Sequence, residues 1–87
     1  MSERAIYRLS VQADALEDGL VRILNIVALQ PVELKSVRHE QVTLGTTTVI
    51  EVVAAKPGRA QLLAARLREA VWARDVKLVG LETAMNT

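Results

Sequence analysis

The order of hydrophobic patterns along the chain is the feature that most constrains its fold. Strand-like alternation and helix-like spacing follow one another as strand, helix, strand, strand, helix and strand over nearly all 87 residues. This βαββαβ order builds one four-stranded antiparallel sheet with two helices on one face. The sequence therefore predicts a single α+β domain over residues 1–87, with its core at about 5–81 and a polar C-terminal tail at 82–87.

The first strand and the first helix are predicted from the N-terminal third. Apolar and polar side chains alternate over residues 5–13, which is typical of a half-buried strand. Asp14 and Glu17 have the spacing of a capping box, so we expect the helix to begin at Asp14. Pro31 should end the helix by Gln30. The apolar stripe of this helix comprises Leu16, Leu20, Ile23, Leu24 and Val27.

A hairpin is predicted in the middle of the chain. Residues 32–41 alternate and then change phase near Ser36-Val37, which predicts a bulge or the exposed end of a long arm. A turn at 43–46 leads into the β-branched run 47–55, the clearest strand of the sequence. The side chains expected to face the helices from this strand are Ile50, Val52 and Ala54.

The second helix and the last strand complete the pattern. Pro57 and Gly58 break the preceding strand, and Gly58 is expected to be the helix N-cap. The predicted buried stripe comprises Ala60, Leu63, Ala64, Leu67 and Val71. Trp72 is then expected to cover the core or to project sideways into a subunit contact. A short strand at 76–79 follows, and the whole arrangement is a ferredoxin-like sandwich.

Composition excludes several classes of partner. The net charge is +1, with 11 Lys and Arg against 10 Asp and Glu, so the concentrated positive field that attracts nucleic acid is missing. The absence of Cys removes disulfides and the commonest zinc sites, and it fits a reducing cytoplasm. No apolar run approaches the roughly 18–20 residues that span a bilayer. We therefore expect a cytoplasmic protein that binds neither nucleic acid nor membrane.

No set of residues has the spacing of a reactive site. His39 lacks a ligand set around it and is expected to be an exposed hairpin residue, while Ser10 and Ser36 lack a base that could activate them. The carboxylates of residues 14–18 are explained by the helix start. We therefore expect no enzyme activity, no catalytic residue, no metal and no cofactor. Four arginines could hold a phosphate or form a solvated face: Arg59, Arg66, Arg68 and Arg74.

Other functions that this kind of fold supports are not favoured. An RNA-recognition surface needs exposed aromatics on the central strands, but the alternation places Tyr7 on the helix-covered face. A copper carrier needs a thiolate pair after the first strand, and an acylphosphatase needs an arginine cradle there; neither is present. The uncovered sheet face is more apolar than water alone requires, so part of it is expected to be covered. The edge strands offer unpaired backbone groups, so continuation of the sheet into a second copy is also expected, and the sequence does not decide which of these surfaces is used.

Four segments carry a resemblance to a known family: residues 14–23, 32–37, 63–71 and 75–79. Over about residues 5–81 the chain resembles an ACT domain, and in size and layout it is similar to the small regulatory subunit of acetolactate synthase of the isozyme II type. The resemblance implies a regulatory module that pairs as a homodimer and contacts a catalytic subunit in branched-chain amino-acid synthesis.

The resemblance also implies an amino-acid effector site where the first strand–helix loop of one copy meets the second strand of its neighbour. Its residues would be Gln12, Ala13, Asp14, Ala15, Leu16, Gln30 and Val32. With Asp14 in the helix cap, its negative charge should repel an effector carboxylate, so we expect effector binding to be weakened or lost. The alternative is a free-standing sensor that binds an amino acid at the dimer interface without an enzyme partner.

Overall fold

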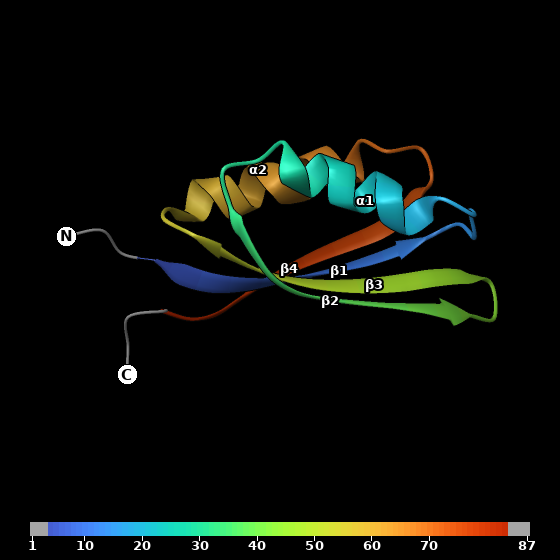
Figure 1. The fold of residues 1–87 in the computed structure, drawn as a ribbon, viewed down its shortest axis with the longest axis horizontal. Coiled ribbons are helices and arrows are strands. Elements are labelled where there is room, and N and C mark those ends of the chain that lie inside the picture. Colours follow the sequence, from blue (N-terminus) through green and yellow to red (C-terminus); the bar gives the residue numbers. More distant parts are fainter. Residues whose placement is uncertain (1–3, 84–87) are drawn as a thin grey trace.

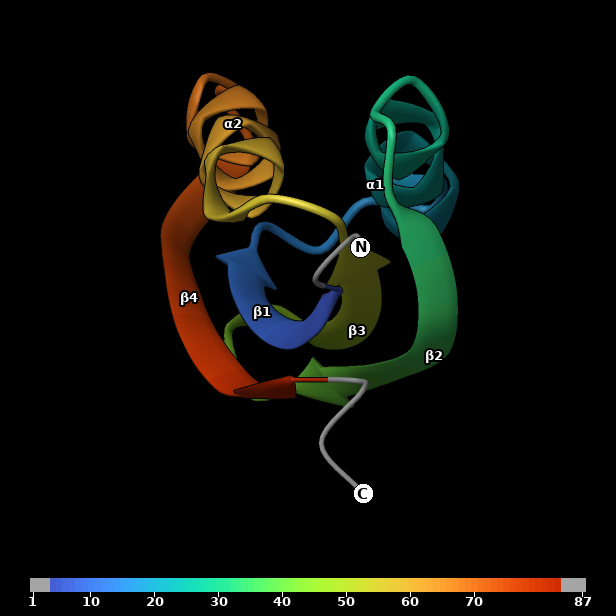
Figure 2. The ribbon, with the colours of Figure 1, turned by 90° about the vertical axis from the view of Figure 1, so that its left-hand side faces the viewer.

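The computed structural model describes residues 4–83 and confirms the predicted ferredoxin-like fold. Its elements are β1 (Ala5–Ala13), α1 (Gly19–Ala28), β2 (Glu33–Val42), β3 (Gly45–Ala54), α2 (Pro57–Arg68) and β4 (Ala73–Thr83). The strands form one antiparallel sheet in the order β2-β3-β1-β4, so β2 and β4 are its edges. Both helices cover one face, with α2 on the β4 side and α1 on the β2 side (Figures 1 and 2).

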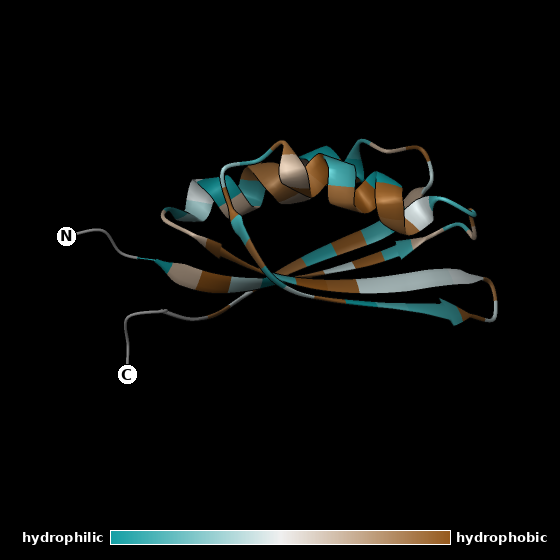
Figure 3. Cartoon of the chain, viewed as in Figure 1, coloured by the Kyte–Doolittle hydropathy of each residue, from teal (hydrophilic) through white to brown (hydrophobic). Residues whose placement is uncertain are grey.

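The core lies between the two central strands and the two helices. Its fully buried side chains include Leu9, Val11, Ile50, Val52, Ile23, Leu63 and Leu67. Burial of each large aliphatic side chain contributes about 1.5–3 kcal/mol. Ile50, Val52 and Ala54 of β3 are buried beneath the helices, as predicted. The prediction that Tyr7 lies on the helix-covered face is also confirmed, because it packs against the core. Toward the hairpin turn, β2 is hydrophilic and β3 is intermediate in hydropathy (Figure 3), and Thr46 and Thr48 of β3 are buried there.

The predicted start of the first helix is wrong. α1 begins at Gly19, and residues 14–18 form a loop. Asp14 is held by tertiary contacts instead of capping a helix: its carboxylate accepts a hydrogen bond from Arg74 at 2.7 Å, and its N–H donates to the Trp72 carbonyl at 2.9 Å. Leu16, predicted in the buried stripe, therefore lies outside the helix and is 37% exposed.

The two ends of the second helix also differ from the prediction. Pro57 occupies the first turn and Lys56 is the N-cap, so Gly58 lies inside the helix. The helix ends at Arg68, three residues before Val71, the last residue of the predicted stripe. The chain then turns, with the Ala73 N–H donating to the Ala70 carbonyl.

Because the helix has ended, the residues after Arg68 no longer follow the helical spacing that predicted which of them are buried. Val71 is 97% exposed, whereas Trp72 packs against the core. The prediction of Val71 as a core residue is therefore wrong, and Trp72 takes the covering role.

The last strand is longer than the predicted 76–79, whereas β1 has the predicted bounds and β2 has the predicted length. β4 extends to Thr83, and the remainder of the predicted tail, 84–87, lies outside the described residues. The register of β2 against β3 shifts between Leu34 and Ser36, which confirms a bulge close to the predicted place. The His39 ring is half-buried rather than exposed, because its Nδ1 shares a 2.7 Å hydrogen bond with Oγ1 of the buried Thr48. No helix in the described part of the chain is long and apolar enough to cross a membrane.

Candidate functional site

The predicted effector residues lie at opposite ends of one molecule. Gln12 and Ala13 end β1, and the loop with Asp14, Ala15 and Leu16 follows at the end of the sheet that carries the hairpin turn (Figure 1). Residues 30–32 follow the other end of α1. Since α1 has 10 residues, its length of about 15 Å separates the two groups. A single copy therefore does not bring the seven residues together.

Residues 12–16, called the loop end from here on, are fixed by contacts with β4 and with the hairpin turn. Besides the two contacts of Asp14, the hairpin turn packs closely on β1: a Cβ added to Gly45 would lie 2.2 Å from the Ala13 carbonyl oxygen. A hollow of about 140 Å³ lies beside this contact. Its lining residues include Gln12, Ala13, Val42, Leu44, Gly45 and Arg74. The loop therefore offers a defined surface, with the exposed Leu44 lining the hollow and the exposed Leu16 in the loop itself.

The start of α1 has no side-chain cap. Asp18 occupies the N-cap position without a side-chain hydrogen bond to the helix amides. Its carboxylate instead pairs with Arg22 Nε at 2.9 Å, and the hydrogen bond from Arg22 lowers the pKa of Asp18. The expected repulsion of an effector carboxylate assumed that Asp14 caps this helix. Because Asp14 is paired with Arg74, that premise is wrong.

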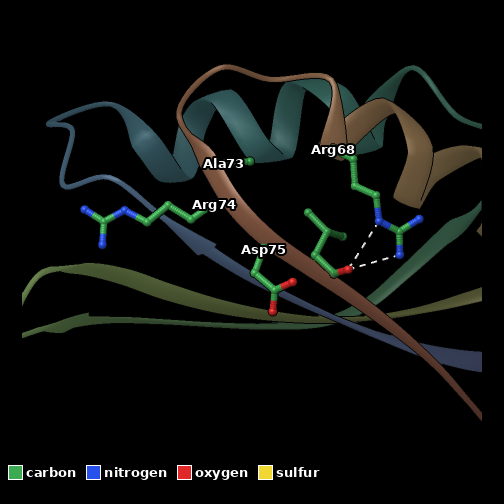
Figure 4. A pocket seen from close by; sticks show the side chains of 5 residues that line it. Arg68, Ala73, Arg74 and Asp75 are labelled. Atoms are coloured by element: carbon green, nitrogen blue, oxygen red, sulfur yellow. Dashed lines mark hydrogen bonds between the residues drawn. The ribbon is translucent and has the colours of Figure 1, made fainter.

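The two sheet edges differ in accessibility. On β2, every residue except His39 is exposed. On β4, the Arg68 guanidinium reaches across from α2, and its Nε and Nη2 both donate to the Val76 carbonyl at 3.3 and 3.0 Å (Figure 4). An arriving strand would have to displace this guanidinium to pair there. The β2 edge is therefore more open to strand pairing than the β4 edge.

The predicted arginine group does not form one cluster. A hollow of about 190 Å³ lies beside Arg68 and Arg74, but these two side chains point away from each other (Figure 4). Arg74 pairs with Asp14, and Arg66 contacts Glu69 at 3.4 Å. Arg66, Arg68 and Arg74 thus have partners within the protein, and the phosphate-holding alternative gains no support.

Sequence reasoning missed a polar row on the uncovered face of the sheet. Arg8 on β1, Glu51 on β3 and Ser36 on β2 lie side by side in the strand register. Arg8 Nη2 lies 2.9 Å from Glu51 Oε2, and Ser36 Oγ donates to Glu51 Oε1 at 3.2 Å. The hydrogen bond from Arg8 is the main cause that lowers the pKa of Glu51. The three residues are far apart in sequence, so only the register of three strands reveals the row.

Within residues 4–83, no group of three or more His, Cys, Asp or Glu side chains could hold a metal ion. The candidate surfaces are thus the loop end, the β2 edge and the uncovered sheet face.

Comparison with known proteins finds similar structures but no similar sequences. No family model and no curated protein matches the sequence. Among solved structures, the crystal structure of the ACT domain from GTP pyrophosphokinase of Chlorobium tepidum matches with a TM-score of 0.79 at 8% identity, covering 87% of this chain and 99% of that one. The solution structure of the same domain gives a TM-score of 0.77 at 8% identity, covering 87% and 86%.

A second protein has a similar fold over nearly the whole chain. The C-terminal domain of the MgtC protein from Mycobacterium tuberculosis matches with a TM-score of 0.70 at 16% identity, covering 99% of this chain and 95% of that one. Identities this low establish shared architecture, and the finer resemblance to acetolactate synthase subunits stays a prediction. The chain has the ferredoxin-like fold that ACT domains adopt.

Proposed function

We propose that this chain is a non-catalytic regulatory module of the ACT type, which works as a pair of copies and modulates a larger biosynthetic enzyme such as acetolactate synthase. The observation that carries the proposal is the separation of the predicted effector residues within one copy. Residues 12–16 and 30–32 lie at opposite ends of α1. A site made from both groups requires a second molecule.

Antiparallel pairing of two β2 strands would supply that second molecule. Because the partner strand runs in the opposite direction, the loop end of one copy then lies beside residues 30–32 of the other. Two apolar side chains on the helix-facing side of β2 would gain cover: Leu34, which is 42% exposed, and Val37, which is 37% exposed. The β4 edge is less suited to pairing because Arg68 occupies the Val76 carbonyl.

Sedimentation velocity of the Val37→Asp variant tests the pairing. A charge placed at the β2 edge should convert dimers to monomers, since two buried carboxylates would face each other. Val79→Asp is the control, because Val79 lies on the other edge strand and is also exposed, at 51% against 37% for Val37. Circular dichroism of both variants checks that each keeps its fold. Equal dissociation of the two variants, or a monomeric unmutated chain at high concentration, would count against pairing through β2.

Copurification of the tagged chain from its native source tests the enzyme partner. A stoichiometric thiamine-diphosphate enzyme, whose rate or feedback inhibition changes when this chain is added back, would support the acetolactate synthase assignment. A different biosynthetic enzyme would keep the regulatory role and reject that partner. Recovery of the chain without any enzyme would contradict the regulatory-subunit proposal.

One observation favours the second candidate, a free-standing amino-acid sensor. With Asp14 neutralised by Arg74 and no side chain capping α1, the first helical turn is able to receive a carboxylate. Isothermal titration with branched-chain and other amino acids, performed on the dimer, tests this function. A saturable isotherm without any copurifying enzyme would favour the sensor over the regulatory subunit.

A further inference from the structure

The uncovered face of the sheet contains a hollow that is complete within one copy. Its volume is about 260 Å³, and it lies over β1, β3 and β2, away from both helices. Its lining residues are Arg8, Ser36, Val37, Arg38, Val49 and Glu51. This volume is below the roughly 300–1,000 Å³ of pockets for drug-sized ligands, so a smaller molecule would fit.

Charged groups of both signs face this hollow with hydrogen-bonding capacity left over. A carboxylate has about four acceptor sites. At Glu51, three are used by Arg8 Nε, Arg8 Nη2 and Ser36 Oγ. One acceptor site of Glu51 therefore remains for a donor.

Arg38 supplies the complementary group. Its guanidinium is close enough to Glu51 to favour the ionised carboxylate, yet among the ion pairs of residues 4–83 it has no carboxylate partner. A guanidinium presents five N–H donors in a planar fork that matches a carboxylate. Val49 lies directly opposite Arg38 in the strand register and adds an apolar surface to the hollow.

We propose that this hollow binds a small zwitterion whose ammonium group donates to Glu51 and to the Ser36 hydroxyl oxygen, whose carboxylate contacts Arg38, and whose short apolar group packs on Val49. A simple anion would leave the free acceptor site of Glu51 unused, and a simple cation would leave Arg38 unpaired. The site lies on the open face and needs no second copy, so it does not rest on the proposed function. It is also distinct from the loop residues 12–16 and 30–32.

A nuclear magnetic resonance titration of the ¹⁵N-labelled full chain tests the site. L-valine is the probe, while 3-methylbutanoate lacks its ammonium and isobutylamine lacks its carboxylate. The expected result is a saturable shift of the Arg38, Val49 and Glu51 amides with L-valine, and at least about tenfold weaker binding of the two analogues, since each loses one charge-assisted contact.

Variants locate the contacts. Glu51→Gln and Arg38→Gln should each weaken L-valine binding by about tenfold or more. Lys77→Gln is the matched control, because Lys77 lies on β4 in the same register row as Ser10 and Val49 but does not line the hollow. The amide spectrum of each variant confirms that it is folded.

The remaining outcomes would overturn the site. Equal binding of 3-methylbutanoate would show a plain anion surface, and no saturable shift would show no site. Shifts confined to residues 12–16 and 30–32 would also reject the hollow while supporting the proposed effector site. Conversely, monomers that still bind L-valine at Arg38 and Glu51 would preserve this site even if pairing through β2 fails.

Discussion

Gly45 shows how one residue fixes the end of the hairpin. Its φ is +156°, and an added Cβ would lie 2.2 Å from the Ala13 carbonyl oxygen. We predict that Gly45→Ala lowers the free energy of unfolding by about 2 kcal/mol or more, because both the backbone and the neighbouring strand would have to shift. Urea denaturation measures this change.

Gly58→Ala provides the opposite case for the same substitution. Gly58 lies in α2 with no heavy atom within 4 Å of an added Cβ. Alanine should therefore leave stability unchanged or raise it by up to about 1 kcal/mol. Similar destabilisation of both variants would show that the close approach at Gly45 is not the cause.

Glu51 should contribute to the pH dependence of stability. The hydrogen bond from Arg8 lowers its pKa below the ordinary value of a glutamate. The folded state thus favours the ionised carboxylate, so its contribution is present above the unfolded pKa of about 4.3 and is lost as pH falls through the lower native pKa. We predict that the unfolding free energy of the unmutated chain exceeds that of Glu51→Gln at pH 6, and that this difference shrinks below about pH 4.

Urea denaturation at a series of pH values measures the difference. Glu40→Gln is the control, because Glu40 lies on the same sheet face without an ion pair among the described residues. A pH-independent difference between the unmutated chain and Glu51→Gln would reject the linkage.

At the scale of elements, Arg68 protects one edge of the sheet. Its two donors occupy the Val76 carbonyl on β4, whereas β2 has no such cover. We predict that Arg68→Ala opens β4 and produces species larger than those of the unmutated chain, because sheet pairing then continues at both edges. Sedimentation velocity measures the size distribution. Arg66→Ala, which removes only a surface contact with the C-cap residue Glu69, should leave the size distribution unchanged. Larger species in both variants would implicate charge instead of the edge.

Element types were predictable because they depend on local periodicity, but their ends were not. The alternation at β1 and the stripe of α2 are short-range patterns. Asp14 had the local spacing of a cap, yet a contact with Arg74, sixty positions along the chain, determines its place. Likewise, the early end of α2 leaves Val71 exposed and places Trp72 against the core, which is one of the two positions predicted for Trp72. The hollow at Arg38 depends on the alignment of three strands, which periodicity does not encode.

At the scale of the whole molecule, the two candidate binding sites have different requirements. The hollow on the uncovered face is formed by β1, β2 and β3 of one copy. The proposed effector site combines residues 12–16 of one copy with residues 30–32 of another, since α1 separates them within a single chain. The first site should be independent of protein concentration, whereas the second should exist only while copies are paired.

This difference predicts how apparent affinity responds to dilution. When the protein is diluted through the range in which sedimentation shows dimers dissociating, the apparent affinity of a ligand at the paired site should fall, because part of its binding energy must then drive association. Affinity at the Arg38 hollow should stay constant. Titrations of the same ligand at several protein concentrations, followed at the amides of both regions, measure the two affinities separately. Constant affinity at residues 12–16 in a dissociated sample would show that one copy suffices there, and the regulatory proposal would lose its reason for pairing.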